Sequence, residues 1–203
     1  MFPDDFTDDE RIDNDPRCRS AFDTTWQELQ AGTTSGNPFN LLQLATINER
    51  DRPEVRTIVL RDADNTEAAL YFITDSRSPK MDDFDHDRNV ALVGYDPASR
   101  VQIRLTGIAS TVGDYDLLAY HWSRLSEKTR ASFNAPVAPG TRLLSDGSLP
   151  SDVQQDNMSA FERFCPIRVE ISDIDRLDIS RNEHVRFCFK RTYRGWLGGR
   201  RAP

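Results

Sequence analysis

Residues 55–60 divide into two sets that alternate along the chain, and this period of two predicts a half-buried strand. Val55, Thr57 and Val59 alternate with Arg56, Ile58 and Leu60. A second β-rich run covers residues 70–74. Ser78 and Pro79 then predict the start of a helix, with a hydroxyl cap and a proline at the first helical position, where its missing N–H costs nothing.

Further apolar periodicities place elements on both sides of this unit. Helices are predicted over residues 19–31, 79–86 and 158–164 and after Asp114, and strands over 41–47, 89–95, 101–109, 167–171 and 185–189. A turn is expected at 62–65, a long Pro-, Gly- and Ser-rich loop at 135–150, and a Gly- and Arg-rich tail at 196–203. Roughly six or seven close strands with three or four helices predict a mainly β fold, an antiparallel barrel with peripheral helices.

Two of these elements have faces of contrasting chemistry. In strand 101–109, Val101, Ile103 and Leu105 form an apolar face, and Gln102, Arg104 and Thr106 form a polar one. A wholly polar face can meet solvent or line a ligand pocket, and the pattern leaves both open. In the helix after Asp114, an apolar stripe of Leu118, Trp122 and Leu125 lies beside a stripe with Tyr120 and Arg124.

Length and charge narrow the class of protein. The 203 residues suit a single domain over 18–203, preceded by an acidic arm over 1–17 that we expect to be mobile or loosely docked. The net charge of −7 argues against nucleic-acid binding. Three cysteines without a C-x-x-C pair indicate a reducing compartment. No apolar run approaches the roughly 20 residues of a membrane span, and no signal peptide is apparent, so a soluble cytoplasmic protein is expected.

The helix start near Ser78 is rich in groups that bind anions. Thr74, Ser76, Arg77, Ser78 and Lys80 crowd around it, and Arg56 and Arg61 can arrive from the neighbouring strand. Such a cluster fits one phosphate, because a helix start also offers unpaired N–H groups. The alternative is a solvated, charged turn with an ordinary cap. The acidic run of Asp82, Asp83, Asp85 and Asp87 is read as a solvated helix face.

No catalytic signature stands out, and the pattern assigns no catalytic residue. His86, His121 and His184 lie far apart without metal-ligand spacing, so each is expected to be a surface or packing histidine, and no metal site is predicted. There is no G-x-S-x-G, Walker loop or G-x-G-x-x-G motif. If the protein is an enzyme, a bound cofactor supplies the chemistry.

Five fragments in order resemble the pyridoxine (pyridoxamine) 5′-phosphate oxidases and their FMN-binding split-barrel relatives. They are Arg56-Thr-Ile-Val-Leu-Arg61, Phe72-Ile-Thr-Asp75 through Lys80, Val101-Gln-Ile-Arg-Leu-Thr-Gly107, Tyr120-His-Trp-Ser-Arg124, and the carboxy end from Trp196 to Pro203. Each fragment is weak alone, but the shared order and spacing are specific. The resemblance covers the chain from about residue 40 to the end, except for the region 135–155.

The resemblance implies a split β-barrel of the antiparallel Greek-key type, forming a homodimer with FMN at the subunit interface. It implies that Arg56, Ser78 and Lys80 hold the FMN phosphate and that Gln102 reaches the isoalloxazine ring. The other cofactor contacts implied are Thr57, Ile58, Val59, Leu60, Arg61, Ile73, Thr74 and Arg186. Substrate contacts are implied for Arg61, Tyr120, Arg124, Lys128 and His184, whose alternative role is surface packing.

The departures from the family pattern concern the substrate. Asn182 stands where the family has an arginine that grips pyridoxine phosphate, and Asn cannot replace a bidentate arginine clamp. Lys128 replaces a serine, and the family's Gln-Ser pair has no clear counterpart in residues 135–139. We therefore expect an FMN-dependent oxidoreductase acting on a B6 vitamer or another small molecule. A flavin reductase with a nicotinamide donor and a non-catalytic flavin- or tetrapyrrole-binding module remain the alternatives.

Overall fold

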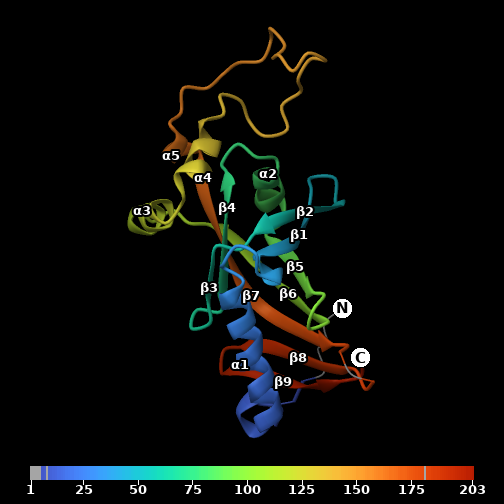
Figure 1. The fold of residues 1–203 in the computed structure, drawn as a ribbon. Coiled ribbons are helices and arrows are strands. Elements are labelled where there is room, and N and C mark those ends of the chain that lie inside the picture. Colours follow the sequence, from blue (N-terminus) through green and yellow to red (C-terminus); the bar gives the residue numbers. More distant parts are fainter. Residues whose placement is uncertain (1–5, 8, 181) are drawn as a thin grey trace.

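The computed structural model describes residues 6–7, 9–180 and 182–203, and its framework is one antiparallel sheet. The nine strands of this sheet are β1 (Leu41–Ile47), β2 (Pro53–Val59), β3 (Asp62–Asp64), β4 (Ala69–Asp75), β5 (Asn89–Asp96), β6 (Val101–Thr111), β7 (Phe164–Asp178), β8 (Val185–Thr192) and β9 (Gly195–Arg201). They run in the order β2-β1-β5-β6-β7-β4-β3, while β8 pairs with β7 and β9. The sheet curls into a half-barrel around an apolar core (Figure 1), which confirms the mainly β, antiparallel split-barrel prediction.

Two strands lie where no strand was predicted. The expected turn at 62–65 contains the short strand β3, and the expected tail contains β9. Neither segment has a strong local pattern, because β3 is held by its pairing with β4 and β9 by its pairing with β8. A Cβ added to Gly198 would come within 2.4 Å of the Phe189 ring, so this part of β9 is glycine because it packs tightly. Tertiary contacts, not propensity, create both strands.

Strand β7 changes partner halfway along its length. Residues 164–170 pair with β4, whereas residues 173–178 pair with β8, and β6 follows β7 on its other side. The register with β6 shifts between Thr106 and Gly107, which leaves Ser172 as an extra residue. Such a bulge bends and twists a strand, so the sheet can divide at this point.

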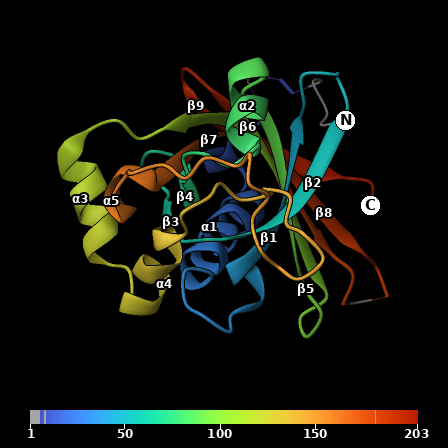
Figure 2. The same cartoon turned by 90° about the horizontal axis from the view of Figure 1, so that it is seen from above.

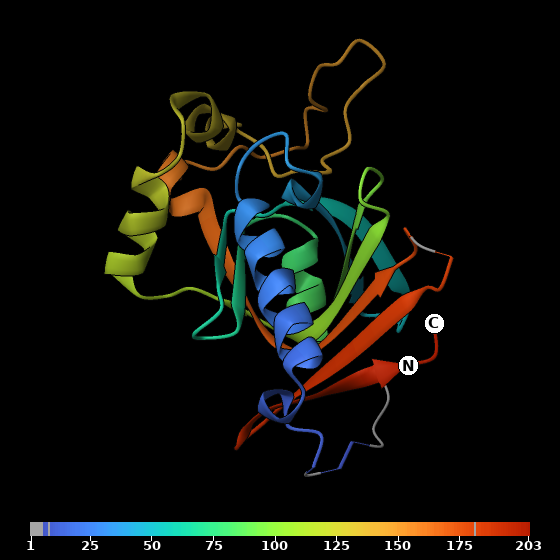
Figure 3. The ribbon, with the colours of Figure 1, turned by 60° about the horizontal axis from the view of Figure 1, so that its bottom comes forward.

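Helix α1 (Pro16–Ala31) packs against the strands at the carboxy end (Figure 3). It begins earlier than the predicted residue 19, because Asp15 caps it by accepting a hydrogen bond from the N–H of Arg17 at 2.8 Å. The Phe22 ring lies 5.3 Å from the Phe189 ring and 5.1 Å from the Trp196 ring. Its predicted apolar face is thereby buried, and Trp26 is fully inaccessible.

A second, smaller core holds the helices on the outer face of β4. These helices are α3 (Tyr115–Ser123), α4 (Glu127–Ala131) and α5 (Ala160–Arg163), and they lie together at one side of the sheet (Figure 2). Leu125, Phe133 and Phe164 form the centre of this core, with Trp122 and Ile73 packed against it. The Asp114 cap is confirmed, since its carboxylate accepts from the N–H of Leu117 at 3.0 Å.

The division into an arm over 1–17 and a domain over 18–203 stays a prediction, and residues 1–5 and 8 lie outside the described residues. Within the arm, Arg11 forms a β-bridge with Leu197, and Ile12 is buried. None of the helices in the described ranges is both long and apolar enough to cross a membrane.

Replacing Gly107 by alanine is expected to lower the free energy of unfolding by about 1–3 kcal/mol, because crowding in a packed sheet costs that much. The added Cβ would lie 2.2 Å from the carbonyl oxygen of Glu170. Chemical denaturation measures the change. Gly113→Ala is the control, since a Cβ there meets nothing within 4 Å. Equal stability of the two variants would contradict the assigned bulge.

Candidate functional site

Lys80 stands at the centre of the predicted anion cradle. Its ammonium donates to the hydroxyl of Thr74 at 2.8 Å and to the hydroxyl of Ser78 at 2.6 Å. Strand β4 supplies Thr74, and the turn into helix α2 (Lys80–His86) supplies Ser78. The predicted hydroxyl cap is wrong, because α2 follows Pro79 with no side-chain cap and the Ser78 hydroxyl accepts from Lys80 instead. The hydroxyls therefore hold the lysine in place.

Arg56 reaches the same region from β2, held by a buried carboxylate. Its Nη2 donates to Oδ2 of Asp83 at 2.9 Å, and its Nη1 donates to the hydroxyl of Thr46. The Thr46 hydroxyl in turn donates to the same Asp83 oxygen at 2.6 Å. Asp83 is only 6% exposed, so its assignment to a solvated helix face was wrong. Its side of the short helix faces strand β1, which sequence periodicity alone could not reveal.

The cradle carries positive charge that its own groups do not fully neutralise. Burial lowers the pKa of Lys80, and the nearby Arg56 guanidinium lowers it further. Lys80 has three N–H donors, of which two go to neutral hydroxyls. An anion placed here would stabilise the charged form of Lys80, which burial disfavours. The residues present thus fit a phosphate group.

Arg77, which the sequence placed among the phosphate-binding groups, has a different role. It donates to Asp75 at 2.7 and 2.9 Å, to the carboxylate of Asp156, and to the carbonyl of Ala135 at 3.1 Å. The buried Arg163 also binds Asp156, at 2.7 Å. These hydrogen bonds, Arg163 foremost, lower the pKa of Asp156 to about 2. The result is a charged clamp at the base of the long loop.

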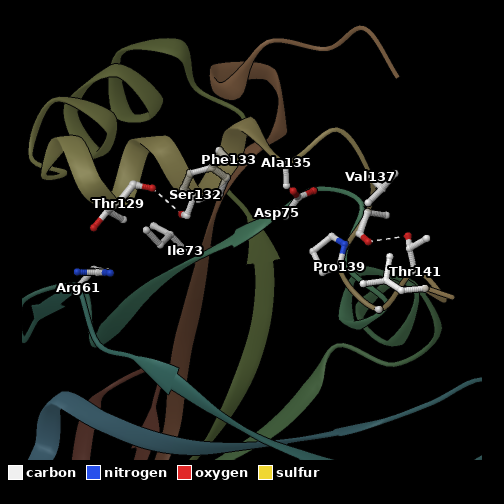
Figure 4. A pocket seen from close by; sticks show the side chains of 13 residues that line it. Arg61, Ile73, Asp75, Thr129, Ser132, Phe133, Ala135, Val137, Pro139 and Thr141 are labelled. Atoms are coloured by element: carbon white, nitrogen blue, oxygen red, sulfur yellow. Dashed lines mark hydrogen bonds between the residues drawn. The ribbon is translucent and has the colours of Figure 1, made fainter. Parts of the chain in front are cut away.

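The clamped loop lines a cavity of about 510 Å³ next to the cradle (Figure 4). Arg61 and Ile73 lie on the strand side, Thr129, Ser132 and Phe133 come from α4 and the turn after it, and the loop contributes Val137, Pro139 and Leu143. A Cβ on Gly140 would lie 3.7 Å from the Pro79 ring, so the loop also touches the start of α2. Sequence reasoning gave this loop no site residue, because only the fold brings it here.

Arg61 is the unpaired group of this cavity. Its Nε is buried and has no hydrogen-bond partner among the described residues. Burial lowers the pKa of the guanidinium. A buried donor without a partner is costly, which favours an acceptor in the cavity. Arg61 is therefore placed to contact an anionic or polar ligand.

The structure brings several predicted residues together around β2, β4 and α2. Arg56, Thr74, Ser78 and Lys80 form the cradle, and Arg61 and Ile73 line the adjoining cavity. Ile58 and Leu60 lie in the core at 7% and 1% exposure, and the backbone N–H and carbonyl of Leu60 are hydrogen-bonded to Asn40. Thr57 is exposed and Val59 is half-buried.

The substrate residues predicted on the helices form a surface pair. The Tyr120 hydroxyl accepts from Arg124, whose guanidinium lies 5.3 Å from the ring centre. Lys128 is exposed on α4, next to the cavity residue Thr129. His121 is buried against Tyr71 and Tyr120, as expected of a packing histidine.

A third set of predicted residues lies on β6 and β8. Arg186 donates to both oxygens of the buried Asp175, at 3.0 and 2.8 Å. His184 is exposed just before β8, and Gln102 is half-buried on β6. In the described part of the chain, no hydrogen bond or ion pair joins Gln102 or Arg186 to the cradle. One copy of the chain does not unite these residues.

Comparisons with known proteins agree with this architecture. The family model of the pyridoxamine 5′-phosphate oxidase FMN-binding domain matches residues 13–113. A pyridoxine/pyridoxamine 5′-phosphate oxidase 2 of Arabidopsis thaliana is 24% identical over 181 residues, covering 84% of this chain and 91% of that protein. An oxidase of the same name from Acinetobacter baylyi is 32% identical over 83 residues, but this covers only 41% of the chain and 37% of that protein.

Two solved structures share the fold. A pyridoxamine 5′-phosphate oxidase-related, FMN-binding protein of Nostoc punctiforme superposes with a TM-score of 0.72 at 24% identity, over 89% of this chain and 96% of that one. PhzG of Burkholderia lata, in complex with tetrahydrophenazine-1-carboxylic acid, gives 0.66 at 18% identity over both whole chains. These two matches show the split-barrel fold, and the family model with the curated relatives shows that the chain belongs to the pyridoxamine 5′-phosphate oxidase-like family of FMN-binding proteins.

Proposed function

We propose that this chain binds FMN and acts as an FMN-dependent oxidoreductase on a small molecule. The observation that carries the proposal is the cradle, in which Lys80 and Arg56 lie close together, Arg56 pairing with Asp83 and Lys80 donating to two hydroxyls. Clustered cations on fixed hydroxyls are suited to a phosphate monoester. Membership of an FMN-binding family supports FMN as the source of that phosphate.

In this proposal Arg56, Ser78 and Lys80 hold the phosphate of FMN. The cavity beside Arg61 receives the rest of FMN and the substrate. When bound, FMN supplies a ring that accepts a hydride from the substrate. The chain's own residues would orient FMN and the substrate and would exclude water from the cavity. The hydrogen bonds of Arg77 and Arg163 to Asp156 hold the loop over the cavity. The Arg61 side chain lines this cavity and would contact the bound ligand.

A homodimer is part of the same proposal. Gln102 lies on β6, Arg186 on β8 and His184 just before β8, whereas the cradle is built on β2, β4 and α2, so we infer that a second copy completes the site that the family resemblance implies. The outer face of the sheet also exposes apolar side chains, with Leu41 at 52%, Val55 at 66% and Tyr95 at 45%. We infer that this face of the sheet meets the second copy.

Lys80→Met and Arg56→Met are each expected to weaken FMN binding about tenfold to a hundredfold, as losing a hydrogen bond to a charged group costs about 1.5–3 kcal/mol. Quenching of flavin fluorescence during titration measures the dissociation constant. Arg88→Met removes an exposed cation just after α2 and serves as the control. If all three variants bind FMN equally well, the phosphate is held elsewhere.

The affinity for FMN is expected to fall with rising pH below the ordinary lysine range. Burial and Arg56 lower the pKa of Lys80, so it loses its proton early, and only its charged form attracts phosphate. Titrations between pH 7 and 10 measure the fall. Lys80→Arg should flatten the curve, since arginine stays charged. An unchanged curve in that variant would show that another group titrates.

Asn182→Arg is expected to lower the KM for pyridoxamine phosphate about tenfold, because it supplies the bidentate clamp that the family resemblance requires at this position. Formation of pyridoxal phosphate and peroxide by the FMN-loaded protein measures turnover. Glu183→Arg, at the exposed neighbouring position, controls for charge alone. Equal effects of both changes would refute the assigned position.

Rapid bleaching of the flavin by NADH, without formation of pyridoxal phosphate, would favour the alternative function of a flavin reductase.

A further inference from the structure

A second cavity, of about 410 Å³, lies between helix α3 and the β3–β4 hairpin. The residues that matter for its chemistry are Asp62, Asp64, Tyr71, Tyr120 and His121. It shares no lining residue with the cavity beside Arg61. No lysine or arginine is among the described residues that line it. Its chemistry is thus opposite to that of the cradle.

His121 is the buried polar group of this cavity. It is 7% exposed, and its ring lies 5.1 Å from that of Tyr71 and 5.2 Å from that of Tyr120. Within the described chain its ring nitrogens have no hydrogen-bond partner. Burial lowers the pKa of His121, with Arg124 acting in the same direction and Asp62 against it. The neutral ring presents one acceptor nitrogen, and because His121 lines the cavity, an N–H donor bound there can use it.

The two carboxylates each keep an oxygen free. Asp62 uses Oδ1 to accept from the N–H of Ala63 at 2.9 Å, and Asp64 uses Oδ1 to accept from the N–H of Thr66 at 2.8 Å. For the described residues, no hydrogen bond or ion pair uses Oδ2 of either group. Both carboxylates are half-buried, so a positive charge between them would be only partly screened by solvent.

The hairpin that carries these carboxylates is held in one conformation. Ala68, at its far end, is 1% exposed and has a φ of 50°, in the left-handed region that an alanine rarely adopts. Its carbonyl accepts from the N–H of Ile171 at 2.8 Å, which ties the turn to β7. The acceptors are therefore positioned before any ligand arrives, which lowers the cost of binding.

We propose that this cavity binds a small organic cation, a primary amine attached to a flat apolar ring. The ammonium group would lie among Asp62, Asp64 and His121, and the ring would lie against Tyr71, Tyr120 and Leu117, all of which line the cavity. Aromatic faces and carboxylates together favour organic cations. A metal ion is a poorer occupant, as no group of three His, Cys, Asp or Glu side chains suited to a metal occurs among the described residues. The proposal does not depend on FMN.

Titration of the full-length protein, as purified, with benzylamine tests the proposal, using amide chemical shifts or calorimetry. Benzyl alcohol, of similar shape and no charge, and the anion phenylacetate are the comparison probes. Benzylamine is expected to bind at least tenfold more tightly than either. Equal binding of the amine and the alcohol would overturn the proposal.

Asp62→Asn and Asp64→Asn assign the binding to this cavity, because each keeps the oxygen that caps the hairpin and removes the charge. Each is expected to weaken benzylamine binding at least tenfold. Asp116→Asn, on α3 but outside the cavity lining, should change it less than twofold. Affinity for FMN and the thermal midpoint should stay unchanged in all three. Loss of amine binding in Asp116→Asn, or its retention in both hairpin variants, would refute the site.

Discussion

The close contact between Gly107 and strand β7 is the constraint on which the rest of the structure depends. Only a residue without a Cβ can lie so near the carbonyl of Glu170, and the bulge that results lets β7 leave β4 and join β8. The half that stays with β4 fixes Thr74 opposite Cys165, beside the turn that carries Lys80. The other half supports the strands that hold α1. The position of the cradle thus follows from the division of the sheet.

Charge is distributed unevenly over this acidic chain. Arg56 and Arg77 each have a carboxylate partner, whereas Lys80 contacts hydroxyls and the Arg61 Nε contacts no acceptor in the described chain. The region between Lys80 and Arg61 therefore favours an anion. Around the β3–β4 hairpin the balance is reversed, because carboxylates and a neutral histidine line a cavity without a described cation. The cations that pair with carboxylates hold parts of the fold together, whereas Lys80 and Arg61 can pair with a bound anion.

The sequence predicted the local elements well, because strand alternation, the Asp114 cap and the apolar stripes of α1 and α3 all act within a few residues. The family fragments also located the cradle. The sequence did not predict which side chains and strands pair with each other across the fold. Asp83 turns inward because strand β1 offers Thr46, and Arg77 binds Asp156, 79 residues away, in place of phosphate. Strands β3 and β9 likewise exist through their neighbours.

In the proposed function, separate parts of this chain bind the cofactor and determine the substrate. The cradle is built from β2, β4 and the start of α2, where the family fragments are retained. The cavity wall comes instead from α4 and the long loop, where the family's polar pair has no clear counterpart and apolar residues such as Val137 and Leu143 line the cavity. Because the loop is fixed at its base by Asp156 and not by the cradle, its lining can change without disturbing the phosphate contacts. Under the proposed function, divergence in this region would change the substrate and leave the cofactor the same.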